Sequence, residues 1–221
     1  MIAPELISDT IPPLHLDDSG EHALMLMQEY NVSQLPVLDG ANKYSGFITM
    51  EEIIHIKHLS NSLKTFQIQW RAPFVLNTAH IFDVMRAAVD FNIKIVPVVD
   101  ENSEYIGVVS AESCLRAFAL LNSVKDAGAT IEVEIPLQDY TLSEVARIAE
   151  DNNANILCLY TNIKQETATV ELTIKLNTTD VAGMVASFER FEYVVKGVYN
   201  DVKFTEELKD RYDALMRYLN V

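Results

Sequence analysis

The sequence predicts an α/β protein in which two copies of a β-α-β-β-α unit precede a β-α-β-β-α-β domain of ferredoxin-like topology. Two observations carry this prediction. Residues 12–52 match residues 73–113 without a gap, at a constant offset of 61 positions. The match ends in a polar segment, and from residue 131 a different order of strand and helix patterns begins. A repeat at fixed spacing indicates that each copy buries its apolar face against the other.

The identities between the copies fall at positions with a structural role. Proline inside a strand marks an edge or a bulge, while glycine marks a bulge or a close backbone approach. The identical pairs are Pro12/Pro73, Asn31/Asn92, Pro36-Val37/Pro97-Val98, Asp39/Asp100, Tyr44/Tyr105, Gly46/Gly107 and Glu51/Glu112.

Each copy is expected to form the same five elements. A short extended segment leads to a helix with apolar residues at helical spacing, a buried strand follows, and a turn containing an aspartate returns into a second strand and a second helix. We expect the first helices to be capped by Asp18-Ser19 and by Asn77-Thr78. The expected strands are residues 14–16, 32–38 and 44–49 in the first copy and 74–76, 93–99 and 105–110 in the second, and the second helices begin at Glu51 and Glu112.

The segment beyond the repeats has its own pattern. Strands are expected at 131–135, 156–161, 169–176 and 193–199, with one helix ending near residue 152 and another opened by residues 178–180. A final helix over 205–219 carries an apolar stripe that needs a surface to cover it. The expected domains are a first repeat at 1–60, a second repeat at 61–122, a linker at 123–130, the ferredoxin-like domain at 131–200 and a C-terminal helix at 201–221.

Composition narrows the classes of function. The chain has 221 residues, 49% of them hydrophobic, and a formal net charge of −15, which argues against nucleic acid and anionic membranes as partners. No run approaches the ~20 apolar residues of a membrane helix, and the N-terminus lacks the basic region of a signal peptide, so we expect a cytoplasmic protein. Cys114 and Cys158 are too few and too far apart for a disulfide framework and are expected to be free thiols.

The repeats resemble cystathionine-β-synthase (CBS) domains. The match rests on the strand motifs Leu35-Pro36-Val37-Leu38-Asp39 and Val96-Pro97-Val98-Val99-Asp100, each followed by glycine, two apolar residues and a hydroxyl residue. The 131–200 segment resembles an ACT domain in its order of elements. This arrangement of domains is similar to that of acetoin-utilisation protein B-like regulators.

The resemblance implies a regulatory module without a fixed cofactor. Such a module would bind an adenine nucleotide (AMP, ADP or ATP) or S-adenosylmethionine in clefts between the repeats. In the family pattern the hydroxyl meets phosphate and a carboxylate three residues later holds ribose, while apolar residues form a slot for the base. The corresponding residues here are Thr49, Glu52, Ser110 and Ser113, with Leu14, Leu35, Pro36, Val75, Val96 and Pro97 as the apolar part of the clefts.

Both copies depart from that pattern. Glu52 is one methylene longer than the family aspartate, and Ser113 has no carboxylate. Thr49 and Ser110 are also explained as ordinary helix caps. A second hypothesis therefore stays open, in which the repeats are a dimerisation and docking scaffold that no longer binds nucleotide. Both hypotheses predict a homodimer, and the regulated partner, an enzyme or a transporter, is not identified.

Catalytic and metal sites are not expected. No nucleophile, base and orienting group can be assembled from the sequence, and there is no phosphate-binding glycine motif. His55 and His58 lie three apart on an expected helix, which is more typical of solvated side chains than of a metal site. Trp70-Arg71, between the repeats, is expected to fill the seam, and base stacking is the alternative. In the ACT-like segment Asp139 lacks the glycine of the family's amino-acid sites, which argues against amino-acid binding.

Overall fold

The computed structural model describes residues 1–8, 11–56, 58–66 and 73–200. The chain divides into two compact units, Met1–Phe118 and Ala119–Val221. The expected C-terminal helix and the Trp70-Arg71 pair lie outside the described residues.

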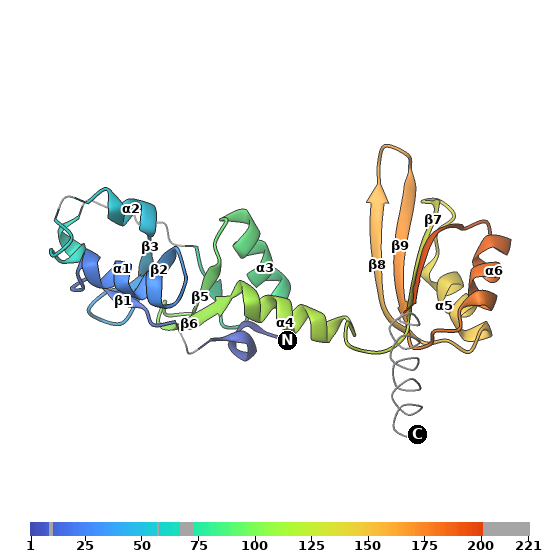
Figure 1. Ribbon diagram of the computed structural model, residues 1–221, viewed down its shortest axis with the longest axis horizontal. Coiled ribbons are helices and arrows are strands. Elements are labelled where there is room, and N and C mark those ends of the chain that lie inside the picture. The colour runs from blue at the N-terminus through green and yellow to red at the C-terminus, as the bar shows by residue number, and fades with distance from the viewer. Residues whose placement is uncertain (9–10, 57, 67–72, 201–221) are drawn as a thin grey trace, which may run out of the picture. The chain divides into compact units, whose positions relative to one another are not determined.

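The first unit has the predicted order of elements in both repeats (Figure 1). Each repeat forms a three-stranded sheet whose order is first, second, third strand, with the first pair parallel and the second antiparallel. A single 3₁₀ turn, η1 (Ala3–Leu6) or η2 (Leu63–Thr65), lies near the start of each repeat. The first repeat consists of β1 (Leu14–His15), α1 (Gly20–Glu29), β2 (Gln34–Leu38), β3 (Tyr44–Thr49) and α2 (Met50–Ile54), and the second of β4 (Val75–Leu76), α3 (Ile81–Asp90), β5 (Ile95–Val99), β6 (Tyr105–Ser110) and α4 (Ala111–Leu121).

The two strand prolines are tolerated because the outer strands are short. β1 pairs only with Val37 and Leu38 of β2, and β4 pairs only with the corresponding two residues of β5. Pro36 and Pro97 therefore lie where the central strand has one neighbour, so the missing N–H interrupts no ladder on that side. The register shifts one residue before Gly46 and Gly107, which places the expected bulge in both hairpins.

One of the predicted helix caps is wrong. Ser19 caps α1 and its hydroxyl accepts the N–H of His22 at 3.1 Å, but α3 is capped by His80 instead of Asn77-Thr78. His80 occupies the position of Ser19 in the second copy, and its Nδ1 accepts the N–H of Phe82 at 3.3 Å. Asn77 is still held by the sheet, because its N–H donates to the carbonyl of Val99 at 2.9 Å, so the helix cannot begin there.

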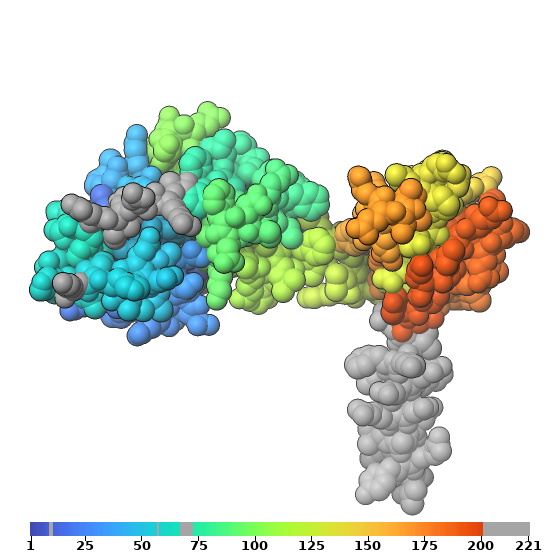
Figure 2. All heavy atoms as spheres, turned by 90° about the horizontal axis from the view of Figure 1, so that it is seen from above, coloured from blue at the N-terminus to red at the C-terminus, as the bar shows by residue number. Residues whose placement is uncertain are grey.

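The hairpin turns of the two repeats pair with each other. The N–H of Tyr44 donates to Ser103 O at 3.3 Å, and the N–H of Tyr105 donates to Asn42 O at 3.4 Å, on either side of an antiparallel bridge between Lys43 and Glu104. These reciprocal bonds place a pseudo-two-fold axis between the copies. The first repeat (blue to cyan) and the second repeat (green) form one continuous body of atoms in Figure 2.

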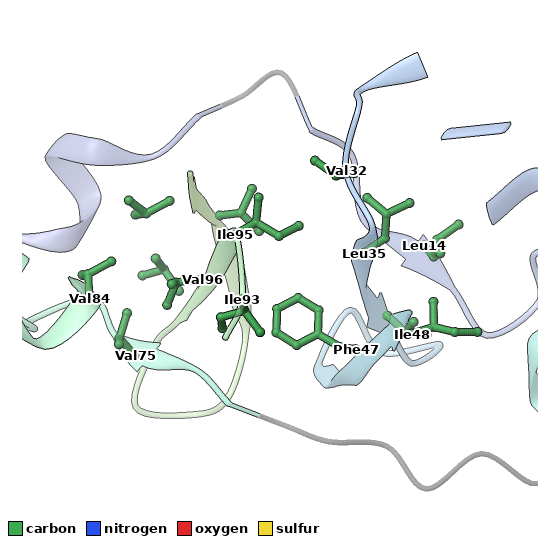
Figure 3. Packing of buried hydrophobic residues seen from close by; sticks show 14 of the residues in the cluster. Leu14, Val32, Leu35, Phe47, Ile48, Val75, Val84, Ile93, Ile95 and Val96 are labelled. Atoms are coloured by element: carbon green, nitrogen blue, oxygen red, sulfur yellow. The ribbon is translucent and has the colours of Figure 1, made fainter. Parts of the chain in front are cut away.

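One hydrophobic core runs through both repeats. Residues on alternate strand positions face opposite sides of each sheet, and cross-strand partners share a side. Phe47 points from the first sheet toward Ile93 of the second repeat, while Leu14, Leu35 and Ile48 lie on the far side of their sheet (Figure 3). We call the side that carries Phe47, and its equivalent in the second sheet, the seam face. The opposite side, which packs on the repeat's own helices, is the helix face.

The second unit is a four-stranded antiparallel sheet of order β10-β7-β9-β8, the ferredoxin-like arrangement. β7 and β9 alternate buried and half-buried residues, so one face forms a separate core with Phe188 and the apolar residues of the helices. The elements are β7 (Ala129–Pro136), α5 (Leu142–Asp151), β8 (Ile156–Lys164), β9 (Thr169–Leu176), α6 (Ala182–Arg190) and β10 (Val194–Asn200).

Several boundaries of this unit differ from the expected ones, and β8 continues to Lys164, three residues beyond the expected end. β7 begins two residues before the expected strand, which leaves residues 122–128 between α4 and the sheet. α6 begins at Ala182 with Val181 at its N-cap, because Thr178 is used one turn earlier, where its hydroxyl accepts the N–H of Asp180 at 3.2 Å.

We expect Leu35→Ala to lower the free energy of unfolding by ~2–5 kcal/mol, since it empties a fully buried site between the sheet and its helices. Met25→Ala, on the exposed side of α1, is the matched control and should cost less than about 1 kcal/mol. Urea denaturation followed by circular dichroism measures both. Equal losses for the two variants would contradict the assignment of Leu35 to the core.

Candidate functional site

The two hydroxyl residues singled out in the sequence lie on the seam face, at the point where the last strand of each repeat passes into a helix. Thr49 is the cross-strand partner of Gln34, and Ser110 is the partner of Ile95. Pro36 and Pro97 lie on the same face, two residues farther along the central strands. The structure therefore brings a hydroxyl and a proline together on the seam face of each repeat.

The other predicted apolar residues lie elsewhere. They pair with residues of the helix face and are buried against the helices of their own repeats, so their side chains do not reach the seam. These residues are Leu14, Leu35, Val75 and Val96.

In the first repeat, Glu52 folds back onto Thr49. Its Oε2 accepts the N–H of Thr49 at 2.8 Å and the Thr49 hydroxyl at 2.8 Å, while Thr49 Oγ1 accepts the N–H of Glu52 at 3.2 Å. This is a capping box, which satisfies the free N–H groups at the start of α2. Glu52 Oε1 has no partner among the residues that the structure describes.

In the second repeat two hydroxyls hold the equivalent strand-to-helix junction, which we call the corner of the repeat. Ser110 Oγ donates to Ser113 Oγ at 3.0 Å and accepts the N–H of Ser113 at 3.0 Å. Glu112, the residue before Ser113, pairs with Arg116 on the exposed side of α4, with 2.5 Å between Glu112 Oε1 and Arg116 Nη2. The second corner therefore has no carboxylate at the position of Glu52.

Sequence reasoning missed Gln34. It is the one buried polar or charged residue in the described part of the chain, with 6% of its surface exposed. It lies on the seam face directly across from Thr49, and its amide has no hydrogen-bond partner among the described residues. The equivalent residue is Ile95, which is also buried. A comparison of the two copies at this position gives the signal, because an amide replaces an aliphatic side chain.

Two tyrosines related by the repeat lie at the centre of the seam. Tyr44 Oη donates to the carbonyl of Pro73 at 3.1 Å, and its ring meets Phe47 and Phe74 edge-on at 6.0 and 6.3 Å. Tyr105 Oη is buried and has no partner among the described residues, and the same holds for Asn77 Oδ1. Burial raises the pKa of both phenols above the ordinary value of 10.0, so both are neutral at physiological pH.

In the described ranges, no three His, Cys, Asp or Glu side chains gather closely enough to hold a metal ion. The imidazole of His55 forms a hydrogen bond within its own helix turn, because its Nδ1 lies 2.7 Å from the carbonyl oxygen of Glu51. No helix in the described ranges has both the length and the apolar character needed to cross a bilayer.

Comparison with known proteins decides what the repeats are. The family model described as CBS domain matches residues 3–58 and 68–120. The first unit is a tandem pair of CBS domains.

Individual relatives each match about half of the chain. Homoserine O-acetyltransferase of Methanococcus vannielii is 28% identical over 123 residues, which is 54% of this chain and 25% of that protein. The chain thus spans a quarter of the length of this curated relative. A CBS domain pair/ACT domain protein of Thermotoga maritima has a similar fold, with a TM-score of 0.50, 20% identity and coverage of 54% of this chain and 98% of that one. CBSX2, solved in complex with AMP, reaches a TM-score of 0.47 at 18% identity, covering 54% of this chain and 96% of that one.

The two CBS repeats share a backbone and differ in their polar groups. At the end of its hairpin away from the turn, the first repeat has an amide, a hydroxyl and a carboxylate. The second repeat has an aliphatic side chain and two hydroxyls at the same place. The described ranges of the first repeat, 11–56 and 58–66, contain two lysines and no arginine. Lys43 lies in the hairpin turn, at the other end of β3 from Thr49, and Lys64 pairs with Asp17. Among the described residues, none of the ion pairs includes Glu52.

Substitution of the two seam tyrosines tests whether the hydrogen bond of each hydroxyl contributes to stability. Tyr44→Phe should lower the free energy of unfolding by ~0.5–1.5 kcal/mol, because it removes the bond to Pro73. Tyr105→Phe should leave stability unchanged or raise it, since its buried hydroxyl has no described partner. Thermal or urea unfolding of the two variants side by side measures the difference. A larger loss for Tyr105→Phe would show that its hydroxyl is satisfied, by water or by another group.

Proposed function

We propose that this chain is a regulatory, ligand-sensing protein whose CBS pair binds an adenosyl ligand at the seam. The observation that carries the proposal is the equivalent placement of Thr49 and Ser110. Both are half-buried at a strand-to-helix corner on the seam face, where side-chain and backbone polar groups gather beside an apolar surface. Glu52, Ser113, Pro36 and Pro97 complete the two proposed sites, while the predicted residues on the helix face would contribute only through their backbone.

The second unit is proposed to be the responding or assembling part of the protein. Its ferredoxin-like sheet supports an ACT-like assignment through topology alone. Asp139 lies exposed after β7, where its N–H bonds the carbonyl of Pro136 at 3.0 Å. We propose a cytoplasmic, non-enzymatic protein, since no catalytic set is evident among the described residues.

A ligand panel tests this proposal. At about 100 times its dissociation constant, a ligand that binds only the folded state adds ~2.7 kcal/mol of stability, which raises the melting temperature by several degrees. AMP, ADP, ATP, S-adenosylmethionine, NAD and a cyclic dinucleotide should be compared by thermal shift, with Thr49→Val and Ser110→Val as paired variants. At least one compound should stabilise the wild type more than the variants. No shift with any compound at millimolar concentration would favour the scaffold hypothesis.

The scaffold hypothesis has its own support in the first corner. Glu52 and Thr49 satisfy each other, so the capping box is complete without a ligand. In this second proposal the CBS pair is a dimerisation and docking module. Several large apolar side chains of the second repeat lie in solvent on α3 and α4, which suits a contact between copies. They are Phe82, Val89, Leu115, Leu120 and Leu121.

We expect a homodimer under both proposals, and charge on these helices should weaken it. Val89→Asp and Leu115→Asp place a carboxylate at positions that are 77% and 68% exposed, so the monomer should fold normally. Light scattering should give a dimer mass for the wild type and a lower mass for the variants at the same concentration. Met25→Asp, on exposed α1 of the first repeat, is the control that should stay dimeric. A monomeric wild type would refute the expectation.

A further inference from the structure

Two arginine side chains of the second unit lie over one aromatic ring. Arg147, on α5, has its Cζ 5.2 Å from the ring centroid of Phe191, and Arg190, the last residue of α6, has its Cζ at 5.3 Å. A guanidinium that stacks on a ring uses its planar face, while the N–H groups at its edge stay available for hydrogen bonds. Phe191 therefore holds two cations close together without using their donors.

These donors are not used elsewhere in the described part of the chain. Arg190 forms no hydrogen bond or ion pair there, and the ion pair of Arg147 with Glu144 spans 4.0 Å. Glu144 is instead bonded by the phenol of Tyr193, which donates to its Oε2 at 3.2 Å. The N–H groups of both guanidiniums are thus available to a partner.

The end of α6 does not explain Arg190. A cationic side chain in the last turn of a helix commonly bonds the carbonyl groups that the helix leaves open. Here backbone N–H groups already bond them, because the N–H of Phe191 donates to Ser187 O and to Phe188 O, each at 3.1 Å. The helix end is complete without the arginine side chain.

The other described arginines are arranged differently. Arg86 pairs with Asp83 at 3.5 Å and Arg116 pairs with Glu112 at 2.5 Å, in each case with a carboxylate one turn away on the same helix. The chain has 32 acidic and 17 basic residues, so carboxylates are abundant, yet the two arginines of the second unit lie together on one ring. Like charges at close range repel each other, and an anion bound between them offsets that repulsion.

We propose that Arg147, Arg190 and Phe191 form a docking surface for an acidic segment of a partner protein. Each guanidinium presents a fork of N–H groups that matches one carboxylate, so two forks suit two carboxylate side chains close together in the partner. Arg147 is 58% exposed, which leaves the surface open to a polypeptide. Arginine and aromatic residues are also enriched at protein interfaces. This docking takes place on the second unit and does not depend on a ligand of the CBS pair.

A synthetic acidic peptide tests the surface. The full-length protein is titrated into a rhodamine-labelled peptide of sequence Glu-Glu-Leu-Glu-Glu at about 0.15 M salt, and binding is followed by fluorescence anisotropy. The net charge of −15 repels an acidic peptide in general, so any binding must come from a local cationic site. The wild type should bind this peptide about tenfold more tightly than the same peptide with glutamine in place of glutamate.

Matched variants locate the binding. Arg147→Gln and Arg190→Gln should each weaken it about fivefold, the upper value for one exposed ion pair. Arg190→Lys keeps the charge but loses the fork, so it should weaken binding as well. Arg86→Gln and Arg116→Gln remove the same charge from exposed positions of the first unit and should leave the affinity unchanged.

Three results would overturn the docking surface. The first is no binding of the acidic peptide at millimolar concentration, and the second is an equal loss for Arg86→Gln and Arg190→Gln. The third is displacement of the peptide by inorganic phosphate at a concentration no higher than the dissociation constant of the peptide. In that case the arginines would form a site for small anions instead of a surface for a protein.

Discussion

The seam between the two repeats is the constraint on which the first unit depends. Each three-stranded sheet has two apolar faces, and its own helices cover only one of them. The other face is buried because the equivalent face of the second copy packs against it, with Phe47 between the two sheets. The reciprocal bonds of Tyr44 and Tyr105 set the register of this contact. A single repeat would leave this apolar face in water, and the pairing of the two copies buries it.

The same constraint places the candidate sites. A pseudo-two-fold axis carries Thr49 onto Ser110, so both hydroxyls come to the seam face at equivalent corners. The backbone there is held in the same way in both copies, because the N–H of Met50 donates to the carbonyl of Ser33 and the N–H of Ala111 donates to the carbonyl of Lys94, each at 2.8 Å. Side chains at the corner are free to differ without loss of the fold. The contrast between Gln34 and Ile95 is therefore a difference of chemistry on one scaffold.

The sequence predicted the backbone of the repeats better than it predicted which face of the sheet each side chain occupies. The constant offset, the paired prolines and the paired glycines encode backbone geometry, and the repeats were predicted with the correct order of elements. Which face a residue occupies depends on strand register, and no local pattern in an all-buried strand such as β2 reveals it. Leu35 was therefore expected in the cleft although it packs on the helices. His80 was overlooked as a cap because histidine is an unusual N-cap, and only its alignment with Ser19 indicates the role.

Glu52 shows how stability and recognition can share one side chain. Glu52 completes the capping box after Thr49, and Asp83 completes the one at the start of α3, where its Oδ2 accepts the N–H of His80 at 3.2 Å. In Glu52 one oxygen closes the cap and the other has no described partner. A ligand that donates to Oε1 leaves the cap intact, while a ligand that needs the Thr49 hydroxyl must break it. The carboxylate of Glu52 thus stabilises the start of α2 in the same way that the carboxylate of Asp83 stabilises the start of α3.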